Sequence, residues 1–127
     1  MNPVLNVDGV EVPVDSSATL DAVILKLHND NQNGPKLIQL VAQSGATMSL
    51  GVGAPVSILH YISPEGWPAY TACGTDPEAL GTLSFTLCGE LTELPAAFGV
   101  PFETAKAGFL DFFNRSERPD CFEWSED

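Results

Sequence analysis

The chain has 127 residues, of which 44% are apolar and 17% charged, a composition typical of one globular domain rather than of a disordered chain. Its 17 acidic and 5 basic side chains give a net charge of −12, which argues against binding to nucleic acid or anionic lipid, because phosphate binding needs clustered Lys and Arg. The same charge would attract a basic partner, although acidity that only keeps the protein soluble explains it equally well.

The first expected elements are a β-hairpin and a helix. Residues 4–7 and 10–14 flank Asp8-Gly9, a dipeptide typical of tight hairpin turns. Apolar residues then recur at helical spacing behind the capping oxygens of Ser16 and Ser17, so the sequence predicts a helix over residues 18–29. The segment 29–35, which ends in Gly-Pro, cannot continue that helix comfortably.

The middle of the chain reads as a series of strands joined by short turns, which favours antiparallel pairing. Within residues 56–62, alternation places His60 and Ile62 on one face and Leu59 and Tyr61 on the other. Pro95 and Gly99 interrupt the stretch after residue 89, so residues 90–100 are expected to form a longer connection. The predicted strands are 36–43, 47–52, 56–62, 67–73 and 81–88.

A second helix and a closing strand are expected at the C-terminal end. Pro101 suits the first helical position, and Gly108 costs helical stability unless the helix packs closely against the sheet there. A short strand over residues 121–124 follows. These elements predict an α+β fold within a single domain of residues 1–127, with two main helices packed on a mostly antiparallel twisted β-sheet. The apolar stripe of the helix comprises Phe102, Ala105, Phe109, Leu110 and Phe113.

No motif for catalysis, metal binding or cofactor binding is recognised. His28 and His60 lack partners at ligand spacing, and Gly51-Val52-Gly53 lacks the third glycine of a dinucleotide loop. We therefore expect no enzyme, no metal and no cofactor. A pair of carboxylates in a cleft stays open, because sequence cannot distinguish a catalytic pair from solvated surface.

The cysteines Cys73, Cys88 and Cys121 form no CxxC pair and are odd in number, which argues against a disulfide framework. We expect them to be buried, reduced thiols of a cytoplasmic protein. The first residues show no signal peptide, and no apolar run is long enough to span a bilayer.

Aromatic and acidic residues around the predicted turns suggest a surface for binding a protein partner. Tyr61, Trp67 and Tyr70 bracket a turn that contains Glu65, and large aromatic side chains beside acids are good interface anchors. Trp67 could equally cap the edge of the core. Four further acids would join this surface if their loops lie at one end of the sheet, namely Asp76, Glu78, Glu90 and Glu93. A second acidic group, more simply a solvated tail, comprises Glu117, Asp120, Glu123, Glu126 and Asp127.

The second half of the chain resembles a bacterial family of immunity proteins that are encoded beside polymorphic toxins. The resemblance lies in the turn from Tyr61 to Tyr70, the segment LSFTLCGELTELP from Leu83 to Pro95, and the helix opened by Val100-Pro101. Its most specific part is the end of that helix, followed by Arg118-Pro119 and a final strand with Glu123-Trp124. Relatives tend to have glycine where this chain has Ser116, which is also a turn former.

The resemblance implies a cytosolic, non-enzymatic protein that binds one toxin domain tightly and blocks its active site. Several toxins of this kind are nucleic-acid deaminases, and the partner implied here is a basic toxin domain, compatible with a cytidine deaminase that acts on double-stranded DNA. Two alternatives stay open: an adaptor or chaperone for a secreted effector, and a small carboxylate-dependent hydrolase. The hydrolase alternative requires that the protein turns over a substrate and that a Glu90→Gln variant shows no turnover.

Overall fold

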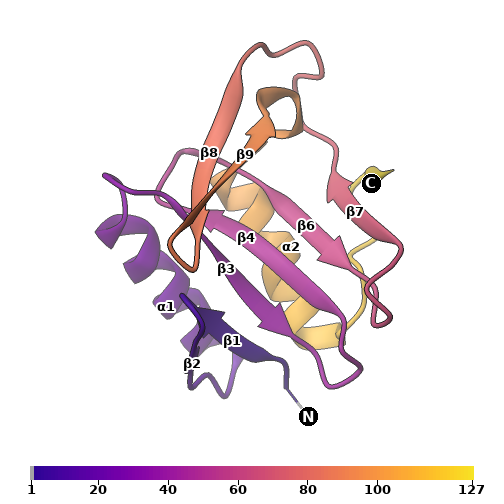
Figure 1. Ribbon diagram of the computed structural model, residues 1–127. Helices are drawn as coiled ribbons and strands as arrows, with labels where there is room; N and C mark the ends of the chain where they lie inside the picture. The colour runs from indigo at the N-terminus through magenta and orange to yellow at the C-terminus, as the bar shows by residue number, and fades with distance from the viewer. Residues whose placement is uncertain (1) are drawn as a thin grey trace.

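A computed structural model describes residues 2–127. Its larger sheet has nine strands: seven lie side by side with two helices on one face, and the other two form a β-hairpin folded over the opposite face (Figure 1). This architecture confirms the predicted α+β class. The elements are β1 (Val4–Val7), β2 (Val10–Val12), α1 (Ser17–Asp30), β3 (Lys36–Val41), β4 (Thr47–Val52), β5 (Val56–Ser57), β6 (Leu59–Ile62), β7 (Ala69–Ala72), β8 (Thr82–Leu87), β9 (Glu90–Pro95), the 3₁₀ turn η1 (Ala96–Phe98), β10 (Val100–Pro101), α2 (Phe102–Arg115) and β11 (Trp124–Glu126).

The main sheet has the strand order β11-β7-β6-β4-β3-β1-β2, and every neighbouring pair in this path is antiparallel. β8 joins β3 through a single parallel bridge, Lys36 to Thr86, and β9 pairs only with β8. The hairpin of β8 and β9 therefore leaves the sheet at the start of β3. Figure 1 shows it crossing in front of the sheet, while α1 and α2 lie behind.

Both helices form where the apolar spacing predicts them. The Ser16 hydroxyl accepts a hydrogen bond from the Thr19 N–H and caps α1, which buries Leu20 and Ile24. α2 begins at Phe102, one residue after the proline that was expected to open it. Its buried face confirms Phe102, Ala105, Phe109 and Phe113, leaves Leu110 half-buried, and adds Gly108 and Phe112.

Two glycines allow close packing on opposite faces of the sheet. A Cβ at Gly108 would lie 2.5 Å from the Phe122 ring and 2.7 Å from Leu59, which confirms the expected close approach of α2. A Cβ at Gly51 of β4 would lie 2.5 Å from the ring of Phe85 on β8. Gly51 therefore lets the fully buried Phe85 ring lie on the bare sheet and attach the β8–β9 hairpin to it.

The stretch from residue 90 to residue 100 is not the connection that the sequence predicts. It contains β9, η1 and β10, and the turn before it, Cys88-Gly89, has positive φ angles of 51° and 82° that are typical of a two-residue hairpin. Cysteine is an uncommon turn residue, which hides the signal. The alternation from Glu90 to Pro95 is a weak strand signal because Glu and Pro are rare in strands.

Smaller corrections concern other strands and the cysteines. Residues 56–62 split into β5, which pairs with β10, and β6, which pairs with β4 and β7. The closing strand begins at Trp124 rather than at residue 121. All three cysteines are free, but Cys88 and Cys121 are exposed and Cys73 is half-buried, so the prediction that they are buried was wrong. Cys88 sits in a tight turn at the hairpin tip, where its side chain cannot reach the core.

His28 at the end of α1 packs against the start of α2, and its contacts require the neutral imidazole. Its ring stacks on Phe102 with centroids 3.6 Å apart, and its Nδ1 accepts a hydrogen bond of 2.9 Å from the N–H of Gly53. An imidazolium cannot accept that bond, and burial lowers the pKa of His28 below its ordinary value of 6.5.

Stability should therefore decrease as the pH falls below 6.5, because the unfolded chain then takes up a proton that folded His28 resists. The contribution of His28 is complete above that pH and is lost progressively below it. Urea unfolding of the wild type and of His28→Gln at about pH 7.5 and about pH 5.5 measures this. The advantage of the wild type over the variant should shrink at the lower pH. An equal difference at both values would contradict the role of His28.

Candidate functional site

Positive charge is absent from the middle of the chain. No Lys or Arg occurs between Lys36 and Lys106, whereas this stretch holds six acids. Glu103 pairs with Lys106 at 3.2 Å. The other five form no ion pair within residues 2–127. They are the five acids predicted from the sequence to bind a protein partner: Glu65, Asp76, Glu78, Glu90 and Glu93.

The five basic side chains are already engaged within the chain. They lie on α1, at the start of β3, on α2 and in the segment after α2, and none of them forms an ion pair with Glu65, Asp76, Glu78, Glu90 or Glu93 within residues 2–127. The charge of these five carboxylates is therefore not compensated by an ion pair within residues 2–127. The internal contacts are Lys26 to Asp30, Lys36 to Asp8, Lys106 to Asp21 and Glu103, Arg115 to Asp111, and Arg118 over the Tyr70 ring.

Trp67 and Glu65 lie in the turn that joins β6 to β7. The turn is closed by hydrogen bonds from the Gly66 N–H to the Ser63 carbonyl and from the Ser63 N–H to the Pro68 carbonyl. The Trp67 side chain is 59% exposed and belongs to neither apolar cluster of the interior. An exposed indole on a hydrogen-bonded turn is a suitable anchor for a protein partner.

Tyr61 and Tyr70 lie on the other face of the sheet, where the helices pack. The Tyr61 ring meets the edge of Phe112 with centroids 6.1 Å apart, and burial raises its pKa, so its hydroxyl stays protonated. The Arg118 guanidinium lies 4.2 Å from the centroid of the Tyr70 ring. Both tyrosines are half-buried, and they form a cross-strand pair that flanks the turn with Glu65 and Trp67.

Asp76 and Glu78 lie at the opposite end of β7 from Trp67, since they belong to the loop between β7 and β8. Asp76 Oδ1 accepts a hydrogen bond from the Glu78 N–H at 3.1 Å, which holds both acids in one turn. The same loop carries Leu80, which is 95% exposed and which the sequence interpretation overlooked. Its signal in the sequence, an apolar residue two positions after Glu78 and directly before Gly81, is weak without the structure.

Glu90 and Glu93 lie on β9, which the sequence interpretation did not recognise as a strand. Glu90 closes the hairpin tip opposite Leu87, and Glu93 is opposite Ser84 on the outward face. Leu91 shares that outward face and is 65% exposed. The five acids therefore occupy three separate places: the β6–β7 turn, the β7–β8 loop and β9.

A cleft of about 250 Å³ separates β9 from the open face of the sheet. Its lining is mostly apolar, and three of its polar side chains follow the cross-strand register from Gln39 through Ser49 to His60. His60 Nε2 lies 2.7 Å from Oδ2 of Asp127, the residue after β11. The lining comprises Leu37, Gln39, Ser49, Ile58, His60, Ile62, Leu87, Thr92 and Leu94, and it contains no carboxylate.

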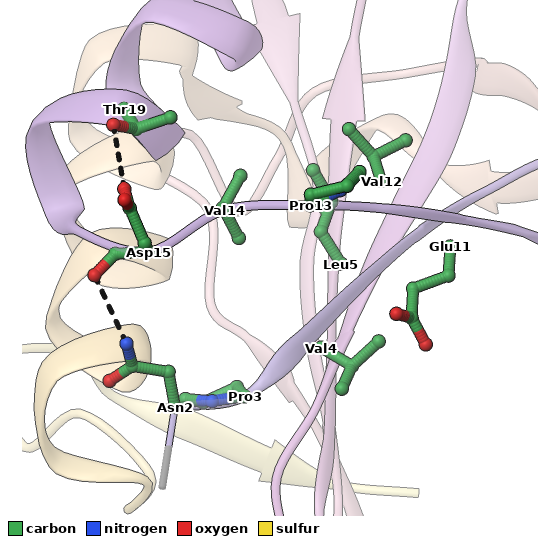
Figure 2. A pocket seen from close by; sticks show the side chains of 10 residues that line it. All are labelled: Asn2, Pro3, Val4, Leu5, Glu11, Val12, Pro13, Val14, Asp15 and Thr19. Carbon is green, nitrogen blue, oxygen red and sulfur yellow. Dashed lines mark hydrogen bonds between the residues drawn. The ribbon is translucent and has the colours of Figure 1, made fainter.

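A second cavity, of about 410 Å³, lies beside β2 and the start of α1. Figure 2 shows its two carboxylates, Glu11 and Asp15, at opposite sides with Pro13 and Val14 between them. Asp15 is also held by the Thr19 hydroxyl at 3.1 Å. The two acids do not converge on one point, as a catalytic pair must.

The described part of the chain offers little else for chemistry. Among residues 2–127, no group of three or more His, Cys, Asp or Glu side chains could hold a metal ion. Over the same residues, neither helix has the length and apolar character needed to cross a bilayer. What the geometry provides is an acidic surface with exposed apolar side chains.

Comparison with known families gives one match. The model of the family described as "Immunity protein Imm1" matches residues 8–126, which is nearly the whole chain. No curated protein matches the sequence.

Proposed function

Because this chain belongs to the Imm1 family of immunity proteins, we propose that it binds a cognate toxin domain and blocks its active site sterically, without chemistry of its own. The observation that carries the proposal is the stretch from residue 37 to residue 105, which has no Lys or Arg and five carboxylates free of ion pairs within residues 2–127. Such a surface is preorganised for a basic partner, because no internal ion pair has to break before its carboxylates can pair with Lys or Arg of that partner.

The toxin we propose is a nucleic-acid deaminase, with a cytidine deaminase that acts on double-stranded DNA as the specific candidate. An enzyme that holds DNA needs a basic cleft, and an acidic protein can occupy that cleft in place of the phosphates. The proposal places the immunity protein in the cytoplasm, where its three free thiols would stay reduced.

In this proposal, Trp67 anchors the complex and the carboxylates of Glu65, Asp76, Glu78, Glu90 and Glu93 pair with Lys or Arg of the toxin. Contact of the toxin with Tyr61 and Tyr70 stays a prediction. The two rings pack against each other on the helix side of strands β6 and β7, where Tyr61 also contacts Phe112 of α2. Protection from a lethal enzyme needs about nanomolar affinity, roughly −12 kcal/mol, which a standard interface of about 1,600 Å² can deliver if a few anchors dominate.

The direct test mixes the purified protein with the C-terminal domain of the toxin encoded beside it. We expect a stable complex and loss of cytidine deamination on double-stranded DNA at equimolar concentration. Absence of both would refute the proposal. A stable complex in which the toxin stays active would instead identify an adaptor or chaperone.

Removing two charges from the β7–β8 loop should slow association with the toxin. The variant Asp76→Asn/Glu78→Gln keeps the side-chain shapes and the turn hydrogen bond, but it removes two unpaired carboxylates. We expect the association rate to fall about three- to tenfold at low salt, and its dependence on salt to weaken, because steering acts at long range. Stopped-flow or surface-binding kinetics at several salt concentrations measure both quantities.

The matched control is Glu11→Gln/Asp15→Asn, which removes the same charge beside β2. Its association rate should change much less than that of the loop variant. Equal slowing in both variants would mean that net charge alone steers the encounter, and it would remove the loop from the proposed interface.

A further inference from the structure

β9 is a free edge of the β8–β9 hairpin. It hydrogen-bonds to β8 on one side, and no other strand within residues 2–127 pairs with it. The two-residue turn Cys88-Gly89 makes Leu87 and Glu90 a hydrogen-bonded pair, so the hydrogen-bonded positions of β9 are residues 90, 92 and 94. Leu91 and Glu93 therefore direct their backbone N–H and C=O groups away from β8, toward the free edge.

The 250 Å³ cleft lies between this strand and the open face of the sheet. Thr92 and Leu94 of β9 form one wall, and Ile58, His60 and Ile62 form the facing part of the sheet. In Figure 1, the hairpin stands in front of β4, and β6 and β7 continue beyond its β9 side. A strand laid beside β9 would thus have alternate side chains directed into a mostly apolar cleft.

The charges on β9 select which strand can be added. Glu93 faces outward and forms no ion pair within residues 2–127, although the Thr82 hydroxyl donates a weak hydrogen bond of 3.4 Å to it. A second copy of this chain would place Glu beside Glu, which blunts self-association at an exposed edge. A basic strand would instead set Lys or Arg beside Glu93, on the face where cross-strand partners meet.

We infer that the toxin supplies an extended segment that pairs with β9 as an additional strand. Its apolar side chains would enter the cleft opposite Thr92 and Leu94, and a Lys or Arg would lie opposite Glu93. The backbone hydrogen bonds would come from Leu91 and Glu93, and the cleft would select the sequence. This inference rests on the proposed function and specifies how the same partner is held.

The decisive comparison is Glu93→Pro against Glu93→Ala in binding to the purified toxin domain. Both variants lose the carboxylate, but only proline also loses the outward N–H. Proline is tolerated at an edge position whose N–H faces solvent, so the hairpin should remain folded. We expect Glu93→Ala to weaken binding about two- to fivefold and Glu93→Pro about tenfold more, because one backbone hydrogen bond is lost and the strands are held apart.

Hydrogen exchange of the wild-type complex gives an independent measurement that does not depend on a variant. The amides of Leu91 and Glu93 should exchange at least tenfold more slowly in the complex than in the free protein, whereas those of Thr92 and Leu94, already bonded to β8, should change little. Equal affinities of the two variants, or unchanged exchange at Leu91 and Glu93, would overturn strand addition. If the wild type still inhibits the toxin in that case, the proposed function survives and only the mode of binding is wrong.

Discussion

Replacing Trp67 with alanine should weaken toxin binding about 30- to 1,000-fold, which corresponds to roughly 2–4 kcal/mol at a dominant interface anchor. Trp67 is 59% exposed on a short turn, so its removal leaves both apolar clusters of the interior intact. The lost free energy is therefore expected in the dissociation rate of the complex rather than in folding. Titration calorimetry with the purified toxin domain measures the affinity, and urea unfolding checks the fold.

The matched control is Val10→Ala, because Val10 is also largely exposed, at 64%, and lies on the distant β1–β2 hairpin. Its affinity should stay within about twofold of the wild type. Trp67→Phe should recover part of the lost affinity, since a phenyl ring restores much of the buried area. An affinity of Trp67→Ala within twofold of the wild type would show that the indole contributes little to toxin binding.

The sequence was most informative where one local rule dominates. The Asp8-Gly9 turn has positive φ angles of 52° and 80°, and it closes the predicted hairpin with Val7 opposite Val10. The Ser16 cap and the Phe102, Phe109 and Phe113 stripe likewise placed both helices. In these places local propensity and tertiary packing agree.

The β8–β9 hairpin was harder to predict because a contact distant in sequence holds it. Phe85 lies over Gly51, and only the close approach of these two residues explains why the segment folds over the sheet. The strand β9 has acids at residues 90 and 93 and proline at residue 95, which local rules assign to a loop. As an edge strand it tolerates all three.

The candidate surface was predictable in its charge but not in its arrangement. The five acids follow from the sequence, and the structure leaves them without ion pairs within residues 2–127. The face of each aromatic residue depends on strand register, which sets Tyr61 and Tyr70 on the helix side, whereas Trp67 lies outside the strands. Register across distant strands is a tertiary property that composition cannot give.

Replacing Phe85 with alanine should destabilise the protein by about 3–5 kcal/mol and should also weaken toxin binding. Phe85 is 1% exposed and forms, with Leu37 and Ile58, the small cluster that holds the hairpin on the sheet. Its loss leaves a cavity under β8 and frees the strand that carries Glu90 and Glu93. The toxin would then have to order the hairpin on binding, which reduces the affinity. Urea unfolding and titration calorimetry measure the two effects.

Phe109→Ala is the control that separates the effect of lost stability on binding from the effect of a detached β8–β9 hairpin. Phe109 is fully buried in the main cluster behind the sheet, so its truncation should cost a similar free energy of unfolding, about 3–5 kcal/mol. The β8–β9 hairpin stays attached in that variant, because the Phe85 cluster is separate. Measured at a temperature where both variants are folded, Phe109→Ala should bind the toxin within about threefold of the wild type, whereas Phe85→Ala should bind at least tenfold more weakly. Equal affinities of the two variants would mean that the hairpin contributes nothing specific to recognition, and that the acids of β9 serve solubility alone.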